Sequence, residues 1–142
     1  MSTYFSPGLP TDPPVLDPET RPYWAAAERG TLVVPFCTAC EQHFWYPRGF
    51  CPRCAGDAIE WPQVSGHGEI YSYSVVRRGF GAWAEHTPFV IAWVTLDIGV
   101  TVLTNVVCCT EEQLSVNLPV TALFEAAGDG PPALRFVSRT TF

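Results

Sequence analysis

Two cysteine pairs with the same internal spacing constrain the fold of this 142-residue chain more than any other feature. Two residues separate Cys37 from Cys40 and Cys51 from Cys54, and ten residues lie between the pairs. Such a pair forms a tight knuckle whose thiolates converge on one ion, and two knuckles complete a tetrahedral four-sulfur site. The sequence therefore predicts a metal bound by all four cysteines. Since four sulfurs leave no position for water or substrate, this metal is expected to be structural.

Zinc is the expected metal. Rubredoxin-type iron sites use the same paired spacing, so iron stays open as the alternative. The metal would stabilise a segment too small to build an apolar core of its own. His43 lies between the pairs, but the four cysteines already complete the ligand set.

The cellular compartment is expected to be reducing. Residues 1–14 contain neither a basic stretch nor an apolar one, so we expect no signal peptide, and no apolar run approaches the roughly 20 residues of a membrane span. We therefore expect a cytoplasmic protein, in which paired cysteines bind metal more often than they form disulfides. The remaining pair, Cys108-Cys109, is expected to serve as small buried apolar side chains at the end of a strand.

Composition excludes several classes of protein. Hydrophobic residues make up 47% of the chain and charged residues 15%, which excludes general disorder. The net charge is -6, and all eight basic residues are arginine. An acidic chain is poorly suited to nucleic acid or to an anionic membrane. The 14 prolines and 11 glycines favour short strands and turns over long helices.

Three regions follow one another along the chain. Residues 1–20 are rich in proline and predict an extended arm, either a disordered tail or a strap around a partner subunit. Residues 21–64 are expected to hold a helix and the metal-binding ribbon. The helix is predicted from Pro22 to Gly30, with Thr20 as its cap and an apolar face of Tyr23, Trp24 and Ala27, and a strand is predicted from Leu32 to Phe36.

Residues 65–142 are expected to form a five-stranded barrel. The predicted strands cover residues 69–77, 88–96, 100–107, 120–125 and 134–137. The first should alternate, with Ile70, Ser72, Ser74 and Val76 on one face, and the second should be buried on both faces because it is almost entirely apolar. Residues 78–87 and 128–132 predict loops, and residues 111–114 predict one helical turn. The fold class is thus mainly β, with an N-terminal helix and zinc ribbon followed by an OB-fold barrel.

These motifs together resemble the domain-of-unknown-function-35 family, over about residues 22–137. The residues that carry the resemblance are Tyr23-Trp24, the four cysteines with Pro47-Arg48 and Pro52-Arg53, Trp61, Ser65 to Tyr71, Thr87 to Val90, and Leu96-Asp97 with Gly99. Asn117 replaces a glycine that is frequent in the family, and Ile98 replaces an acidic residue. Both departures lie in turns and affect local geometry alone.

The resemblance implies an accessory subunit. Such proteins pair with thiolase-superfamily enzymes, including lipid-transfer-protein-type thiolases and aldolases, or with MaoC-like enoyl-CoA hydratases. They help to bind acyl-CoA or complete the active site of the partner, so a hetero-oligomer is implied. Analogy at the level of a family sets an expectation and does not demonstrate an activity.

The sequence predicts no catalytic set of its own. It contains no lysine, no Gly-x-Ser-x-Gly elbow and no phosphate-binding glycine loop. Glu85-His86 is the one adjacent acid and imidazole pair, and it falls in a predicted loop where a solvated tip is the simpler interpretation. Sites for anions are more plausible, because arginine binds phosphate through two parallel hydrogen bonds. The candidates for CoA are Arg48, Arg53, Arg77 and Arg78, with solvated side chains as the alternative.

Aromatic residues suggest a partner surface. Trp45, Tyr46 and Phe50 flank the predicted knuckles, and Phe80 and Trp83 lie in a glycine-containing loop. We expect Trp45, Tyr46, Phe80 and Trp83 at an interface, unless the two in the loop fold back onto the barrel.

Two other classes stay open. One is a protein-interaction module without any ligand. The other is a single-stranded nucleic-acid module in which Tyr71 and Tyr73 stack on bases, although both are more simply core or interface residues. The net negative charge and the absence of a basic run disfavour nucleic acid.

Overall fold

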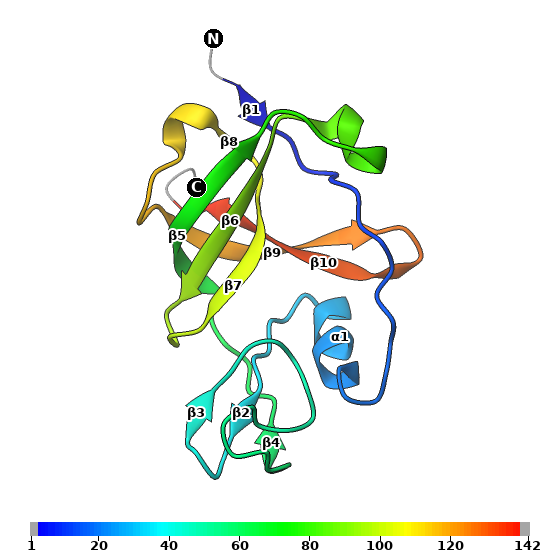
Figure 1. Cartoon of the computed structure of the whole chain (residues 1–142), viewed down its shortest axis with the longest axis vertical. Coiled ribbons are helices and arrows are strands. Elements are labelled where there is room, and N and C mark those ends of the chain that lie inside the picture. The colour runs from blue at the N-terminus through cyan, green and yellow to red at the C-terminus, as the bar shows by residue number, and fades with distance from the viewer. Residues whose placement is uncertain (1–2, 140–142) are drawn as a thin grey trace.

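Residues 3–139, which the computed structural model describes, form a closed barrel with a helix and a small three-stranded sheet at one end (Figure 1). The barrel strands are β5 (His67–Val76), β6 (Phe89–Leu96), β7 (Thr101–Val106), β9 (Pro119–Ala127) and β10 (Gly130–Ser138). They pair in the order β10-β7-β6-β5-β9, and β9 closes the ring on both β5 and β10. The β10–β7 pair is parallel and the others are antiparallel. This order confirms the predicted OB-fold barrel.

Strand β6 is buried along one face, whereas its other face is buried at Phe89 and exposed further along. Val90, Ala92 and Val94 point into the core, whereas Ile91 is 39% exposed and Trp93 is 40% exposed. The prediction that residues 88–96 are buried on both faces is therefore wrong. In a small barrel the inner face of a strand fills the core and its outer face meets the surroundings, so an apolar run can still have an exposed side.

Strand β5 contains a β-bulge that the alternation pattern did not predict. Its pairing with β6 shifts register between Ile70 and Ser72, and the extra residue is Tyr71. Because one residue is inserted, Ser72 and the residues after it occupy the face opposite to the predicted one. The alternation predicted for the strand is thus wrong beyond Ile70. Tyr71 and Tyr73 are 67% and 38% exposed, so neither is a core residue.

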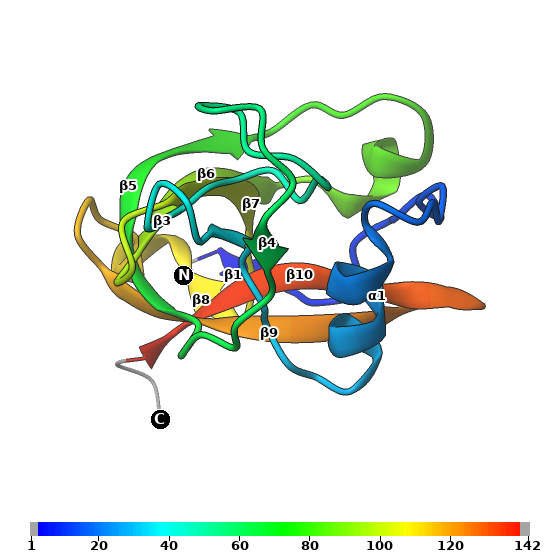
Figure 2. The same ribbon diagram turned by 90° about the horizontal axis from the view of Figure 1, so that it is seen from below.

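Helix α1 (Arg21–Glu28) lies against β10, as Figure 2 shows. Gly30 has φ 71°, and the Thr31 N–H donates to the Ala26 carbonyl, which is the hydrogen bond of a Schellman motif. At the other end Thr20 occupies the N-cap position, as predicted, but its hydroxyl donates to the Asp17 carboxylate and makes no hydrogen bond with the helix. The side chains that α1 buries are Tyr23, Ala26 and Ala27, while Trp24 is half-buried.

The proline-rich arm packs on its own barrel, which neither predicted alternative anticipated. Strand β1 (Tyr4–Phe5) pairs with β8 (Cys109–Thr110), and Phe5 is buried in the core. Further along, the Arg135 guanidinium donates to the Thr11 hydroxyl at 2.7 Å. The arm reaches the ribbon where the Gly49 N–H donates to the Glu19 carboxylate at 2.8 Å. The arm therefore bridges the two parts of the structure.

The small sheet consists of β2 (Phe36–Cys37), β3 (Gln42–His43) and β4 (Ile59–Glu60), in the order β3-β2-β4. The strand predicted over residues 32–36 is mostly wrong, because only its last residue lies in β2. Residues 32–34 are buried, and Val33 forms an isolated bridge with Gln63. This short pairing joins the ribbon to the start of the barrel.

Two short 3-10 helices complete the part of the chain that the structure describes. η1 (Gly81–His86) lies within the predicted loop of residues 78–87, and η2 (Glu111–Gln113) matches the predicted helical turn. The loop predicted at residues 128–132 is shorter than expected, since Pro131 and Pro132 belong to β10. None of the helices in the described part has the length and apolar character that crossing a membrane would require.

Candidate functional site

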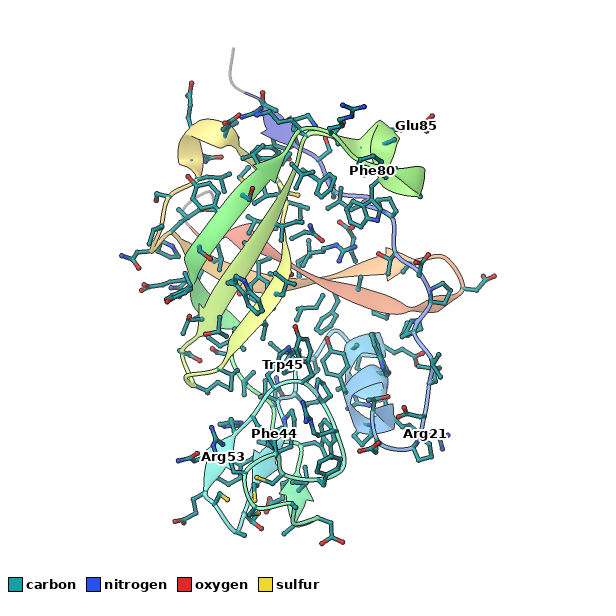
Figure 3. The ribbon with its side chains drawn as sticks, in the orientation of Figure 1. Arg21, Phe44, Trp45, Arg53, Phe80 and Glu85 are labelled. Carbon is teal, nitrogen blue, oxygen red and sulfur yellow. The ribbon has the colours of Figure 1, made fainter. Side chains whose placement is uncertain are left out.

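The four predicted ligands converge at the ribbon end of the molecule, where Figure 3 shows a group of sulfur atoms. All four Sγ atoms lie within 4.8 Å of one another. The Sγ atoms of Cys37 and Cys54 are 3.8 Å apart, and those of Cys40 and Cys51 are 3.9 Å apart. A tetrahedral zinc site with Zn–S bonds of about 2.3 Å places its sulfurs about 3.8 Å apart. The cluster therefore fits zinc.

Backbone N–H groups stabilise the thiolates that a metal needs. The Cys40 N–H donates to Cys37 Sγ at 3.4 Å, and the Arg53 N–H donates to Cys51 Sγ at 3.3 Å. Hydrogen bonding from the Cys54 backbone is the main cause that lowers the pKa of Cys51 to about 7. Donors at knuckle positions favour the ionised form of the sulfur.

The ribbon has almost no core besides this centre. Cys37 and Cys51 are fully buried, and the one other buried apolar side chain of their cluster is Phe44. Such a small cluster cannot offset the conformational entropy of the segment without the metal. The zinc ribbon and its four-cysteine cluster thus support a structural zinc.

The other candidate ligands are placed elsewhere. His43 Nδ1 lies 3.3 Å from the Val34 carbonyl oxygen and is not part of the sulfur cluster. Cys109 is buried in the barrel core and Cys108 is half-buried, so both are separate from the metal centre. Burial is the main cause that raises the pKa of Cys109 to about 11.

The structure separates the four candidate CoA arginines into two pairs. Arg48 and Arg53 lie on the ribbon, whereas Arg77 and Arg78 follow the end of β5 on the barrel. Figure 3 places Arg53 and Phe80 near opposite ends of the molecule. A single phosphate could not contact both pairs.

The candidate arginines also differ from one another in the groups that surround their side chains. The Arg48 guanidinium lies 5.9 Å from the centre of the Phe50 ring. Arg53 lines a polar cleft of about 620 Å³ between the ribbon and the β6–β7 turn, together with His43 and Trp45. Arg77 forms a 2.6 Å ion pair with Glu111.

Arg78 lines a different pocket, of about 670 Å³, between η1 and the barrel wall. Phe80 is at its edge and is 80% exposed, whereas the Trp83 ring lies 4.6 Å from the Phe89 ring. The alternative that the loop aromatics fold back onto the barrel therefore describes Trp83 and not Phe80. On the ribbon side, Trp45 is half-buried with its ring 5.7 Å from that of Tyr23, and Tyr46 is 50% exposed.

The structure also places the acid and imidazole pair and the Ser65 hydroxyl. Glu85 and His86 are both exposed on η1. The Ser65 hydroxyl donates to the Asp97 carboxylate at 2.7 Å and accepts from the His67 backbone N–H, which ties β5 to the β6–β7 turn.

Arg135 is a residue that the sequence analysis missed. It is 8% exposed and lines the same pocket as Arg78. A charged residue in the middle of the apolar run at residues 133–137 was the signal that could have drawn attention to it.

Comparison with known proteins identifies the family. The ChsH2 rubredoxin-like zinc ribbon domain matches residues 24–60, and the ChsH2 C-terminal OB-fold domain matches residues 61–125. A DUF35 domain-containing scaffold protein of Methanocaldococcus jannaschii is 31% identical over 98 residues, which cover 68% of this chain and 70% of that protein. The chain belongs to the DUF35 family. The predicted resemblance is therefore confirmed.

Other relatives of this DUF35 protein carry more specific names. A protein of Thermomonospora curvata named "Probable enoyl-CoA hydratase alpha subunit" is 28% identical over 107 residues, which cover 75% of this chain and 33% of that protein. This chain thus spans about a third of that subunit. The solved structure titled "Ltp2-ChsH2(DUF35) aldolase" has a chain with a TM-score of 0.77 and 26% identity, and the match covers 88% of this chain and 98% of that chain. A DUF35 protein of Sulfolobus solfataricus shares the fold, with a TM-score of 0.62 and 17% identity over 85% of each chain.

Proposed function

We propose that this DUF35 protein is an accessory subunit that pairs with a thiolase-superfamily enzyme and helps it to bind acyl-CoA and complete its active site. The observation that carries the proposal is the similarity to a chain of the structure titled "Ltp2-ChsH2(DUF35) aldolase". The match covers 98% of that chain. That match includes both the ribbon and the barrel, so it extends beyond a shared OB-fold.

The chemistry of the chain supports a role without catalysis of its own. A four-sulfur metal centre has no open coordination position, so it cannot activate water or a carbonyl. The acid and imidazole neighbours Glu85 and His86 are both exposed on η1, where a solvated surface position is the simpler interpretation. The reaction would then take place on groups supplied by the partner.

The exposed aromatic side chains support a docking surface. Phe80 is 80% exposed and Tyr46 is 50% exposed, and large aromatic residues of this kind anchor protein interfaces. The Trp45 ring lies 5.9 Å from the Tyr46 ring and the Trp83 backbone N–H donates to the Phe80 carbonyl, so each tryptophan would support the neighbouring anchor. A buried aromatic anchor at an interface typically contributes about 2 kcal/mol or more to binding.

For the CoA moiety, Arg53 is the best placed of the four arginines. It shares a polar cleft with the imidazole of His43 and the indole of Trp45, which together offer a cation and flat rings to a nucleotide. Arg48 lies on the same ribbon, and Arg77 already pairs with Glu111. We therefore expect Arg53 and Arg48 to contribute more to CoA binding than Arg77.

Assembly tests this function. The zinc-loaded chain is co-expressed with the enzymes encoded beside it, and the complex is isolated through a tag on this chain. We expect a thiolase-like chain to co-purify, and Phe80→Ser to weaken assembly by about tenfold or more. Val116→Ser is the matched control, because Val116 is 56% exposed on the segment between η2 and β9. Isolation of the chain without any enzyme, or sustained acyl-CoA turnover by the chain alone, would contradict the proposal.

A hydratase partner is the second candidate, and the relative from Thermomonospora curvata favours it. The same purification separates the two, because the co-purifying enzyme would act on enoyl-CoA. Salt-dependent binding to single-stranded DNA would instead favour the nucleic-acid alternative, for which Tyr71 and Tyr73 are exposed.

A further inference from the structure

The pocket between η1 and the barrel wall shares Phe80 and Trp83 with the proposed docking surface, but its volume and its charges suggest a ligand of its own. It has a volume of about 670 Å³, within the range of about 300 to 1,000 Å³ that is typical of small-molecule sites. We propose that this pocket binds a small hydrophobic carboxylate, whose apolar body lies among the aromatic and aliphatic side chains and whose anionic end faces Arg78 and Arg135. This inference does not depend on the identity of the partner enzyme.

The lining is mostly apolar and comes from three parts of the chain. Phe80 and Trp83 belong to the η1 segment, Ile91 and Leu103 to the outer faces of β6 and β7, and Leu134 to β10. Ile91 is 39% exposed and Leu103 is 47% exposed, so this apolar surface is accessible in the free chain. A ligand with an apolar body would cover this surface and remove it from water, which favours binding.

The charges at the pocket are one-sided. Its two ionisable lining residues are Arg78 and Arg135, and its remaining polar side chains, Thr104 and Asn105, are neutral. The whole chain has 14 acidic residues and eight basic ones, so a cavity lined by two arginines and no carboxylate runs against the overall charge. Such a site selects an anion over a cation or a neutral molecule.

Arg135 contributes to this argument as a largely buried cation that lines the pocket. Its Nη2 donates to the Thr11 hydroxyl at 2.7 Å and to the Pro10 carbonyl at 3.4 Å. Its Nε is buried and forms a long ion pair of 4.0 Å with Glu125 Oε1, without a hydrogen bond. Glu125 is not among the lining residues.

The environment of Arg135 also makes an added anion favourable. Burial is the main cause that lowers the pKa of this guanidinium, which reflects the loss of water around its charge. A carboxylate in the pocket would add a negative charge beside this guanidinium and favour its ionised form. Arg78, whose residue is exposed, would hold the same carboxylate at the pocket entrance.

Calorimetry on the zinc-loaded full chain tests the site. Sodium decanoate and 4-phenylbutyrate are the probes, and decanamide and 4-phenylbutyramide are their neutral counterparts. We expect one site per chain for at least one carboxylate, with its amide binding about tenfold weaker or worse, because a charge-assisted hydrogen bond is lost.

The variants locate the site. We expect Arg78→Gln to weaken carboxylate binding about tenfold, and Leu103→Asp to abolish it. Arg77→Gln is the matched control. Arg77 is adjacent to Arg78 in the sequence, but its own side chain pairs with Glu111 and does not line the pocket. Arg135→Gln is left out of the first series, since Arg135 also fastens the arm to the barrel.

Each result decides the proposal. Failure of both carboxylates to bind, equal binding of acid and amide, or unchanged binding by folded Arg78→Gln and Leu103→Asp would each overturn it. Circular dichroism of the variants verifies folding. None of these measurements uses the partner enzyme, so the accessory role could fail while the pocket is confirmed, or the reverse.

Discussion

Phe5 and Cys109 lie opposite each other in the β1–β8 ladder, and each is only 1% exposed. The Cys108 N–H also donates to the Phe5 carbonyl at 2.7 Å. A residue from the proline-rich arm therefore fills part of the barrel core. The arm is a structural element of the barrel and not an appendage.

Replacement of Phe5 should destabilise the whole chain. Phe5→Ala removes a buried aromatic side chain and should lower the free energy of unfolding by about 3 to 5 kcal/mol. Urea denaturation of the zinc-loaded protein measures the change. Val15→Ala alters the same arm at a residue that is 85% exposed, and it should change stability by less than about 0.5 kcal/mol. Equal effects of the two variants would show that the arm does not contribute to the core.

Metal analysis should find one zinc per chain. Cys54→Ser should lose the zinc and unfold the ribbon while most of the barrel remains, because oxygen is a poor replacement for a soft ligand and the ribbon has little other core. Elemental analysis and the near-ultraviolet spectrum measure the two effects. Cys108→Ser should keep its zinc. Stoichiometric iron, or a folded ribbon without metal, would contradict this assignment.

Substitutions on the two faces of β6 should differ in their effect on stability. Val94 is fully buried, so Val94→Ala should lower stability by about 2 kcal/mol. Ile91→Thr keeps a β-branched side chain on the exposed face and should change stability by less than about 0.5 kcal/mol. Thermal denaturation of both variants measures this. Similar losses would mean that β6 is covered on both faces after all.

The adjacent cysteines should react at different rates. Burial raises the pKa of Cys109 to about 11, so almost none of it is thiolate at pH 8, whereas Cys108 is half-buried. Iodoacetamide should therefore modify Cys108 at least tenfold faster in the folded, zinc-loaded protein. Peptide mass spectrometry after timed quenching follows both sites. In concentrated urea the difference should disappear, and its persistence there would rule out burial as the cause.

The sequence predicted the parts of this fold that depend on local spacing. Cysteine pairs identify knuckles because the ligand geometry demands that spacing, and the structure brings the four sulfurs together. The five barrel strands follow from short apolar runs between turns. Their order matches the OB-fold, including the helical turn before β9.

The missed features depend on contacts between distant residues. Phe5 pairs with a strand about a hundred positions later, and no local pattern near a proline-rich arm signals that contact. The bulge at Tyr71 depends on how β5 matches β6, and one inserted residue reverses the faces after it. The role of Arg135 depends on such a contact too, because its guanidinium bonds Thr11 on the distant arm.

The attachments of the arm suggest that the chain could be divided in two. Val15 and Leu16 are 85% and 54% exposed, and they lie between the contact of Thr11 with Arg135 and the contact of Glu19 with Gly49. A protease that cuts between them would cleave the backbone but leave Phe5 packed in the barrel core. The N-terminal fragment should then stay bound through gel filtration and separate only in denaturant. A synthetic peptide of this arm should likewise restore a truncated barrel by fragment complementation.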